Sequence, residues 1–358
     1  MTGPTADVPS EESPGKTAFE KRLFRTLVDD ELRLMERELI EVKSIRILAD
    51  CPWKPGKRLR PITFFMAYLA ERLEREPRPK LGTREIRLAA SLELMHEASL
   101  VHDDLVDRST VRRGEPTLQV DHGAAMALIL GDYMVFRALK LALDGAESMR
   151  DVRLAQQMAD TGLAIAHGEV DQLQSYMERR GDPRRLTLDD YDDVIAKKTA
   201  AFFAGCAEGG AALAGAEGER RGTYRRFGMA MGMVFQMVDD LVDVMGDPAL
   251  AMKSLYSNLE EGTVTLPMIH AYTLHPEHPS LTKMAQGEDL DADEQAGLYA
   301  LLATEGVLER CRASLRERRL EAVEALHQLP PSLFREALGD LLDFVSVGPW
   351  GGLEASLS

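Results

Sequence analysis

The chain has 358 residues, of which 45% are hydrophobic and 28% charged, a composition typical of globular proteins with a sizeable core. Its 59 acidic and 43 basic residues give a net charge of −16, which argues against nucleic acid as the main partner. No apolar run reaches the roughly 18 residues of a transmembrane segment, and the first residues lack the pattern of a targeting segment. Cys51, Cys206 and Cys311 lie far apart, which argues against disulfides or structural zinc and predicts a reducing compartment, the cytoplasm.

Helical periodicity begins near Ala18 and continues almost to the C-terminus. Residues 1–17 are rich in Pro, Ser, Thr, Gly and acids and are expected to form a disordered tail. Beyond them, apolar residues recur at helical spacing, Pro and Gly mark the breaks, and no alternating segment predicts a strand. Three segments that are apolar on most faces are expected to be buried: residues 86–102, 124–143 and 227–245. The prediction is one all-α domain over residues 18–350.

The pentapeptide Asp-Asp-Leu-Val-Asp occurs twice, at residues 103–107 and 239–243, each time near the end of an apolar helix. Because residues four apart share one helix face, the first and last aspartates of each copy stand side by side. Carboxylates in a last helical turn repel one another and oppose the helix dipole, so a divalent cation is expected nearby. Mg²⁺ commonly binds one or two carboxylates together with substrate phosphates. One such triplet can equally be a solvated helix face, but two copies within apolar sequence favour a metal site.

Basic residues gather in three clusters. They are Lys57, Arg58 and Arg60 at a predicted helix start, Arg112 and Arg113 after the first acidic copy, and Lys197 and Lys198 before Thr199 in an apolar segment. A helix start offers free backbone N–H groups to an anion. Each cluster alone can be an ordinary basic surface. Together with the carboxylates, they predict a diphosphate held by Mg²⁺ on one side and by Arg or Lys on the other.

Five segments resemble, in order, the motifs of the trans-type polyprenyl diphosphate synthases. LMHEASLVHDDLVDRSTVRRGEPT and FQMVDDLVDVMGDP resemble the two aspartate-rich motifs, and PGKRLRP, GEVDQL and IAKKTAAFF resemble the GGKRxRP, GExxQL and KT segments. The resemblance implies a large helical bundle of the isoprenoid synthase type with a central apolar cavity. It also implies Mg²⁺ as cofactor, a homodimer, and isopentenyl diphosphate and an allylic prenyl diphosphate as substrates. A peripheral membrane contact for product release is compatible with these expectations.

The resemblance also assigns roles to individual residues. Those implied to bind isopentenyl diphosphate are Lys57, Arg60, His96 and Arg113. Those implied to hold the allylic diphosphate are Arg112, Lys198 and Lys253. The implied metal ligands are Asp103, Asp107 and Asp239, supported by Asp104 and Asp243. Thr199 and Gln236 would face the developing carbocation through oxygen dipoles, and His96 alone could equally be a core histidine.

The implied reaction starts with ionisation of an allylic C–O bond. Mg²⁺ and the Arg or Lys side chains would neutralise the leaving diphosphate, and an apolar cavity would exclude water. The residues implied to act in this step are Asp103, Asp107, Asp239, Lys198, Thr199 and Gln236. No Ser or Cys nucleophile is required.

Three positions depart from the family pattern. Pro55 replaces a Gly before Lys57, Asn258 replaces the usual Asp and Thr263 the usual Lys, so weaker substrate affinity is expected of an active enzyme. The alternatives are a terpene cyclase, a non-catalytic subunit of a heteromeric synthase and a helical metal-buffer protein. The complete set of implied isopentenyl diphosphate ligands and the two intact acidic motifs favour the synthase.

Ala98, five residues before Asp103, bears on the length of the product. In the family, short-chain enzymes often carry Phe or Tyr there, where the ring closes the cavity below the first acidic motif. Alanine would let the prenyl tail pass at least one helical turn deeper, until Leu94 or a facing helix stops it. Products longer than farnesyl diphosphate are expected: a long-chain polyprenyl diphosphate is favoured, and geranylgeranyl diphosphate is the lower bound and the alternative. The competing interpretation is that Ala98 only packs against a neighbouring helix.

Overall fold

Helices make up nearly all of the regular secondary structure in the computed structural model, which confirms the predicted all-α class. The structure describes residues 22–42, 56–144, 146, 148–178, 187–245, 264–285, 288 and 290–347. Several predictions fall outside these residues: the tail over 1–17, the ligand Lys253, and the remarks on Cys51, Pro55, Asn258 and Thr263. None of the helices within the described ranges combines the length and apolar composition needed to cross a membrane.

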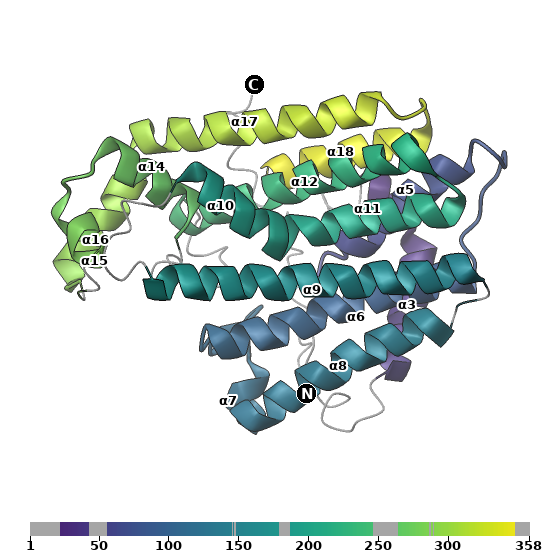
Figure 1. Cartoon of the computed structure of the whole chain (residues 1–358), viewed down its shortest axis with the longest axis horizontal. Coiled ribbons are helices and arrows are strands. Elements are labelled where there is room, and N and C mark those ends of the chain that lie inside the picture. Colours follow the sequence, from purple (N-terminus) through teal and green to yellow (C-terminus); the bar gives the residue numbers. More distant parts are fainter. Residues whose placement is uncertain are drawn as a thin grey trace, which may run out of the picture.

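The first part of the bundle leads to the first acidic motif and past it. Its helices are α2 (Leu23–Thr26), α3 (Asp29–Val42), α5 (Leu59–Arg72), α6 (Thr83–Val106), α7 (Leu118–His122), α8 (Ala124–Asp144) and α9 (Met149–Glu178). Two short strands, β1 (Val111–Arg112) and β2 (Glu115–Pro116), lie between α6 and α7. Figure 1 shows α6 and α8 beside α9 in one half of the molecule.

The second part contains the remaining helices, and its long members form the other half of the molecule (Figure 1). They are α10 (Leu188–Ile195), the π-helix η2 (Ala196–Ala200), α11 (Ala201–Ala214), α12 (Gly218–Met245), α14 (Leu266–Leu274), α15 (Pro279–Ala285), α16 (Ala292–Leu302), α17 (Glu305–His327) and α18 (Leu333–Val347). Helix α11 packs against α5, α9 and α12, and α12 packs in turn against α17.

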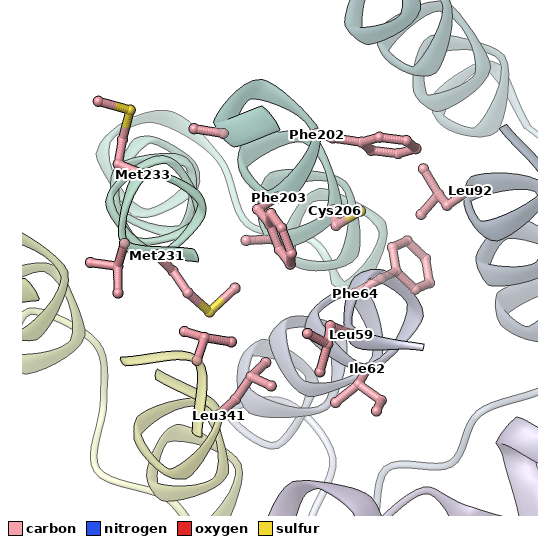
Figure 2. Close-up of a cluster of buried hydrophobic side chains, with 14 of the residues drawn as sticks. Leu59, Ile62, Phe64, Leu92, Phe202, Phe203, Cys206, Met231, Met233 and Leu341 are labelled. Carbon is pink, nitrogen blue, oxygen red and sulfur yellow. The ribbon is translucent and has the colours of Figure 1, made fainter. Parts of the chain in front are cut away.

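The centre of the core lies where α5, α11 and α12 meet. Figure 2 shows Phe203 of α11 between Phe64 of α5 and Met231 of α12, and Phe202 of α11 on the side of Leu92, all buried. Helices α11 and α5 pack closely because Gly210 of α11 carries no side chain. A Cβ at this position would collide with the backbone carbonyl of Phe64 on α5. The close approach of α11 to α5 brings the start of α5, with its basic residues, next to the aromatic side chains of α11.

Helix α8 departs from the predicted burial. The expected burial of 86–102 and 227–245 is confirmed, but the prediction for 124–143 is wrong for the single chain. Leu128, Ile129, Phe136 and Leu143 expose 49%, 62%, 70% and 49% of their surface. Only the opposite face of α8 packs against α6. Apolar periodicity cannot distinguish burial within one chain from burial against another copy.

A small antiparallel hairpin follows α6, although no segment of the sequence predicted a strand. Its turn residues Arg113 and Gly114 have φ values of 54° and 77°, the pattern of a type I′ turn, which matches the twist of paired strands. Gln119 anchors the hairpin by donating to the carbonyl oxygens of Asp104 and Ser109, both at 2.6 Å. Strands of two residues are too short to show alternation in sequence, so the pattern could not have revealed them.

Candidate active site

The first acidic motif closes α6. Asp103 lies in the last turn and Asp107 caps the helix, with its N–H donating to the carbonyl of Asp103 at 2.8 Å. Burial raises the pKa of Asp103 to about 7; Lys198 opposes the shift, and Glu169 and Asp107 add to it. Burial of Asp103 thus outweighs the opposing positive charge of Lys198.

The middle aspartate of this motif has a different environment. Asp104 is 7% exposed, and its Oδ1 accepts from Nε and Nη2 of Arg112 at 2.8 and 2.6 Å. Although burial lowers the pKa of Arg112, the hydrogen bonds and charge of Asp104 raise it overall. Asp104 thereby fixes the hairpin arginine, a pairing that the sequence analysis missed.

The aspartates of the second motif, on α12, divide in the same way. Asp239 is exposed and Asp243 half-buried, whereas Asp240 is 3% exposed. Burial raises the pKa of Asp240 to about 7. Three hydrogen bonds oppose this shift and come from Leu266, Gln236 and Tyr191. In both motifs, the middle carboxylate is thus an internal anchor.

The Lys-Lys-Thr segment forms the π-helix η2, a wide turn that often marks functional positions in helices. A Cβ at Gly168 of α9 would lie 2.8 Å from the backbone nitrogen of Lys198, so only glycine allows α9 to approach η2 this closely. Lys198 Nζ reaches Glu169 at 2.8 Å, whereas Lys197 pairs with Asp171 and Asp193 at the surface. Only Lys198 of the two lysines therefore contributes its charge to the interior.

Adjacent residues of η2 connect the two acidic motifs. Burial lowers the pKa of Lys198, but Glu169 and Asp103 raise it above its usual value, which places the ammonium group near the first motif. Thr199 Oγ1 donates to Gln236 Oε1 at 2.8 Å, one helical turn before Asp239 of the second motif. The structure thus brings both acidic motifs to one region around η2.

The predicted ligands at the start of α5 also come together. The guanidinium of Arg60 lies 5.1 and 4.8 Å from the ring centres of Phe202 and Phe203, and its buried Nε has no hydrogen-bond partner among the described residues. Burial lowers the pKa of His96 well below its usual range, and Arg60 and Arg113 lower it further. His96 is therefore neutral and lies beside arginines that can bind an anion.

Lys57 lies beside Arg60, His96 and Arg113, on the side that faces the second acidic motif. These four residues are called the basic cluster. Burial lowers the pKa of Lys57 to about 8, while Asp239 opposes the shift. A Cβ at the preceding Gly56 would come within 2.9 Å of Arg113 Nη2. Lys57, Arg60, His96 and Arg113 therefore lie in one region, as the sequence analysis expected.

Two acidic residues missed by the sequence analysis hold this basic cluster in place. Glu93 and Glu97, one turn apart on α6, accept from Arg58 Nη1 at 2.5 and 3.2 Å, and Glu97 also accepts from Arg113 Nη1 at 3.1 Å. Arg58 itself has a left-handed backbone, with φ 57°. The sequence feature that could have predicted these contacts is the pair of glutamates four residues apart within an apolar helix, because two buried carboxylates on one helix face need cations beside them.

The carboxylates suit a metal ion that is shared with a substrate. Within the described part of the chain, no three His, Cys, Asp or Glu side chains lie close enough to hold an ion alone. The oxygen donors of Asp103, Asp107 and Asp239 are of the kind that Mg²⁺ binds together with phosphates. The raised pKa of Asp103 marks the place where added positive charge would compensate a buried carboxylate.

A small cavity lies below the first acidic motif. Its volume is about 20 Å³, and Phe64, Ser91, Leu92 and Met158 are among its lining residues. Ser91 lies on the same face of α6 as the fully buried Ala98, two turns farther from Asp103. Leu94, considered as the next stop for a tail, does not line this cavity. A prenyl tail could enter only if the surrounding side chains moved, since such a volume holds little more than one water.

A larger groove of about 700 Å³ lies between α10, α12 and α17. Its lining contains none of the predicted site residues. Arg318, one of its charged residues, pairs with Asp192 at 2.5 Å and Glu321 at 2.7 Å. The groove is therefore separate from the acidic and basic clusters described above.

Comparisons with known proteins agree with this arrangement. The family model described as polyprenyl synthetase matches residues 44–302. The octaprenyl diphosphate synthase of Escherichia coli (strain K12) is 34% identical over 288 residues, 79% of this chain and 83% of that protein. The all-trans-nonaprenyl-diphosphate synthase (geranyl-diphosphate specific) of Rhodobacter capsulatus is 35% identical over 296 residues, 80% of this chain and 83% of that protein.

A solved structure shows the same bundle. It is the polyprenyl synthase from Caulobacter crescentus CB15, complexed with calcium and isoprenyl diphosphate, which superposes with a TM-score of 0.80 at 27% identity. The match covers 90% of this chain and 97% of that one. The predicted helical bundle is therefore confirmed.

Proposed function

The chain belongs to the polyprenyl synthetase family, and on this basis we propose that it condenses isopentenyl diphosphate with an allylic prenyl diphosphate to a longer all-trans product. The observation that carries the proposal is the position of Lys198 and Thr199, which join the two acidic motifs at η2. The octaprenyl and nonaprenyl synthases among its relatives favour a product longer than farnesyl diphosphate. The geranylgeranyl alternative is not favoured.

The acidic motifs, Arg112 and Lys198 would act on the allylic diphosphate. Mg²⁺, bound at Asp103, Asp107 and Asp239, would neutralise the charge that develops on the leaving diphosphate. Arg112 and Lys198 would hold that diphosphate from the other side, as charge-assisted donors. The neighbouring apolar core would exclude water from the cation.

The second diphosphate would bind at the basic cluster. Arg60 and Arg113 carry the charge, and neutral His96 can donate a hydrogen bond without adding a positive charge to the site. The aromatic rings under Arg60 hold its guanidinium in place, and no carboxylate of the described residues forms an ion pair with it. Isopentenyl diphosphate would thus lie beside the ionising allylic carbon.

The direct test incubates the purified chain with isopentenyl diphosphate, Mg²⁺ and, in turn, geranyl, farnesyl or geranylgeranyl diphosphate. Chain lengths are then measured by mass spectrometry. We expect linear products longer than farnesyl diphosphate. A cyclised hydrocarbon would favour a terpene cyclase, and elongation only after addition of a second, different chain would favour a subunit of a heteromeric synthase.

Arg113→Ala is expected to raise KM for isopentenyl diphosphate at least tenfold, with a smaller change in kcat, because it removes a charge-assisted contact to that substrate. Steady-state kinetics with the allylic substrate at saturation measures both constants. Arg108→Ala is the matched control, since Arg108 lies exposed in the same loop and also has positive φ. An unchanged KM in the Arg113 variant would remove Arg113 from the proposed pocket.

We also propose a homodimer formed through α8 and α9. Ile129, Phe136 and Leu143 of α8 are exposed and seven residues apart, and Leu163 and Val170 of α9 repeat this spacing. Exposed apolar residues at seven-residue spacing form a stripe along one helix face, as in helix pairs that pack against each other. A second copy of the chain would cover these two stripes.

A location in the cytoplasm and a peripheral membrane contact during product release stay predictions.

Phe136→Asp is expected to convert the dimer into monomers, because a charge would replace the most exposed aromatic side chain of the stripe. Light scattering coupled to gel filtration measures the mass. Leu320→Asp is the control, since Leu320 is 58% exposed on α17. Wild-type chain with the mass of a monomer, or a dimer that survives the Phe136 substitution, would contradict the proposed interface.

A further inference from the structure

Tyr191 of α10 and Asp240 of α12 form a buried contact next to Gln236 and Thr199. Tyr191 is 5% exposed and Asp240 3%. Tyr191 Oη donates to Asp240 Oδ2 at 2.8 Å, and the backbone N–H of Leu266 donates to the same oxygen at 3.0 Å. The other carboxylate oxygen, Oδ1, accepts from Gln236 Nε2 at 3.0 Å.

These hydrogen bonds have a fixed direction. When Asp240 is ionised it can only accept, and with Oδ2 occupied by Tyr191 and Leu266 its Oδ1 turns the nitrogen of the Gln236 amide toward itself and the amide oxygen away. That oxygen accepts the hydrogen of Thr199 Oγ1 at 2.8 Å. A hydroxyl has one hydrogen and two lone pairs, so Thr199 has only lone pairs left for other neighbours. The oxygens of Thr199 and Gln236 therefore have lone pairs, and no hydrogen, to offer to a further neighbour.

We infer that Tyr191 and Asp240 are positioning residues that set this polarity for the ionisation step. The inference rests on the proposed function, in which the allylic C–O bond breaks, its electron pair leaves with the diphosphate and positive charge stays on the prenyl carbons. Oxygen dipoles that already point at this charge stabilise it without reorientation. A hydroxyl hydrogen in the same place would repel it.

The alternative is that the contact only ties α10, α12 and the start of α14 together. A tie of that kind would lower the melting temperature when broken, but it would leave kcat per folded molecule unchanged. The two interpretations therefore differ in kinetics, and substitutions that keep the volume of the side chain can separate them.

Asp240→Asn is the decisive substitution. The asparagine oxygen can keep the bonds from Tyr191 and Leu266, so its amide nitrogen faces Gln236. Gln236 must then turn its oxygen toward Asn and its N–H groups toward Thr199, which reverses the polarity at constant volume. We expect kcat to fall about a hundredfold, with KM for both substrates and the half-saturating Mg²⁺ concentration changed less than about threefold.

A second substitution should restore the polarity. In the double variant Asp240→Asn/Gln236→Glu, the carboxylate at 236 accepts from the new amide and again accepts from Thr199. We expect it to recover at least about tenfold of the lost kcat. A structural tie would show no such recovery, because the second substitution adds nothing to the contact with Tyr191.

Tyr191→Phe tests the same network without touching α12. It removes one of the donors that hold the Asp240 carboxylate, so the Gln236 amide is held in its orientation less firmly and kcat should fall about three- to tenfold. Tyr272→Phe is its matched control and should keep wild-type kcat, since Tyr272 is similarly buried and donates to the carbonyl of Leu281 at 3.3 Å. If the asparagine variant does not fold, a kcat loss in the Tyr191 variant that Tyr272→Phe does not show decides the question.

The outcomes are distinct. Loss of kcat in Asp240→Asn with recovery in the double variant supports the inference. A kcat within twofold of wild type in folded Asp240→Asn, or equal losses in the single and double variants, overturns it while the proposed function stands. Wild-type chain that elongates no allylic diphosphate overturns both.

Discussion

Replacement of Asp103 or Asp239 by alanine is expected to lower kcat about a thousandfold, because metal-assisted charge neutralisation contributes several kcal/mol and each tenfold in rate corresponds to about 1.4 kcal/mol. The fold should survive. Asp239 is exposed, and burial raises the pKa of Asp103 from its usual 3.8 to about 7, so ionisation of Asp103 lowers stability progressively between these two pH values and in full above about pH 7. Without Mg²⁺ at pH 8, the Asp103 variant should therefore melt no lower than the wild type.

Turnover with varied Mg²⁺ and thermal melting measure the two effects separately. Asp144→Ala is a suitable control, since Asp144 pairs with Lys140 on the surface of α8 and should leave turnover unchanged. Near-normal turnover of either variant at saturating Mg²⁺ would refute a metal site built from both acidic motifs.

Ala98→Phe is expected to shorten the product to farnesyl or geranylgeranyl diphosphate while the first condensation stays active. Ala98 is fully buried in α6, between the acidic motif and the small cavity at Ser91. A phenyl ring there would fill the path of the tail without touching a proposed metal ligand. Product lengths by mass spectrometry and the rate of the first condensation are the two measurements.

Overpacking alone could also disturb the helix, so a second buried alanine serves as control. Ala90 lies on α6, is also fully buried and does not line the cavity. Ala90→Phe should lower the melting temperature by a comparable amount, since inserted volume typically costs about 1–3 kcal/mol, but it should keep the product length. An unchanged product distribution in the Ala98 variant would show that the tail does not pass this residue.

The helices and the acidic motifs could be predicted because their signals are local. Apolar spacing, and Pro and Gly at the breaks, predict helix after helix, and identical pentapeptides mark two carboxylate faces. The exposed stripe on α8 could not be predicted, since Phe136 and Met134 look alike in sequence although one is exposed and the other buried. The single domain over residues 18–350 stays a prediction.

The site was predictable as a set of residues but not as a set of contacts. Both copies of Asp-Asp-Leu-Val-Asp look the same, yet Asp104 binds an arginine of a hairpin and Asp240 a tyrosine and a glutamine from two helices. Arg112 and Tyr191 come from other segments, β1 and α10, whose approach to the acidic motifs depends on packing. The metal and substrate roles assigned to the residues stay predictions.

The π-helix η2 has a consequence for the helix that contains it. A π-turn holds one residue more than an α-turn, and each residue of an α-helix turns the chain by about 100°. The extra residue therefore shifts the rotational phase of α10 relative to α11, which a continuous helix from Leu188 to Ala214 would not have. Tyr191 reaches Asp240 on one side of the shift, and Phe202 lies under Arg60 on the other. The extra residue of η2 thus allows the helix from Leu188 to Ala214 to make both contacts, whereas in a regular α-helix the two side chains would point in other directions relative to each other.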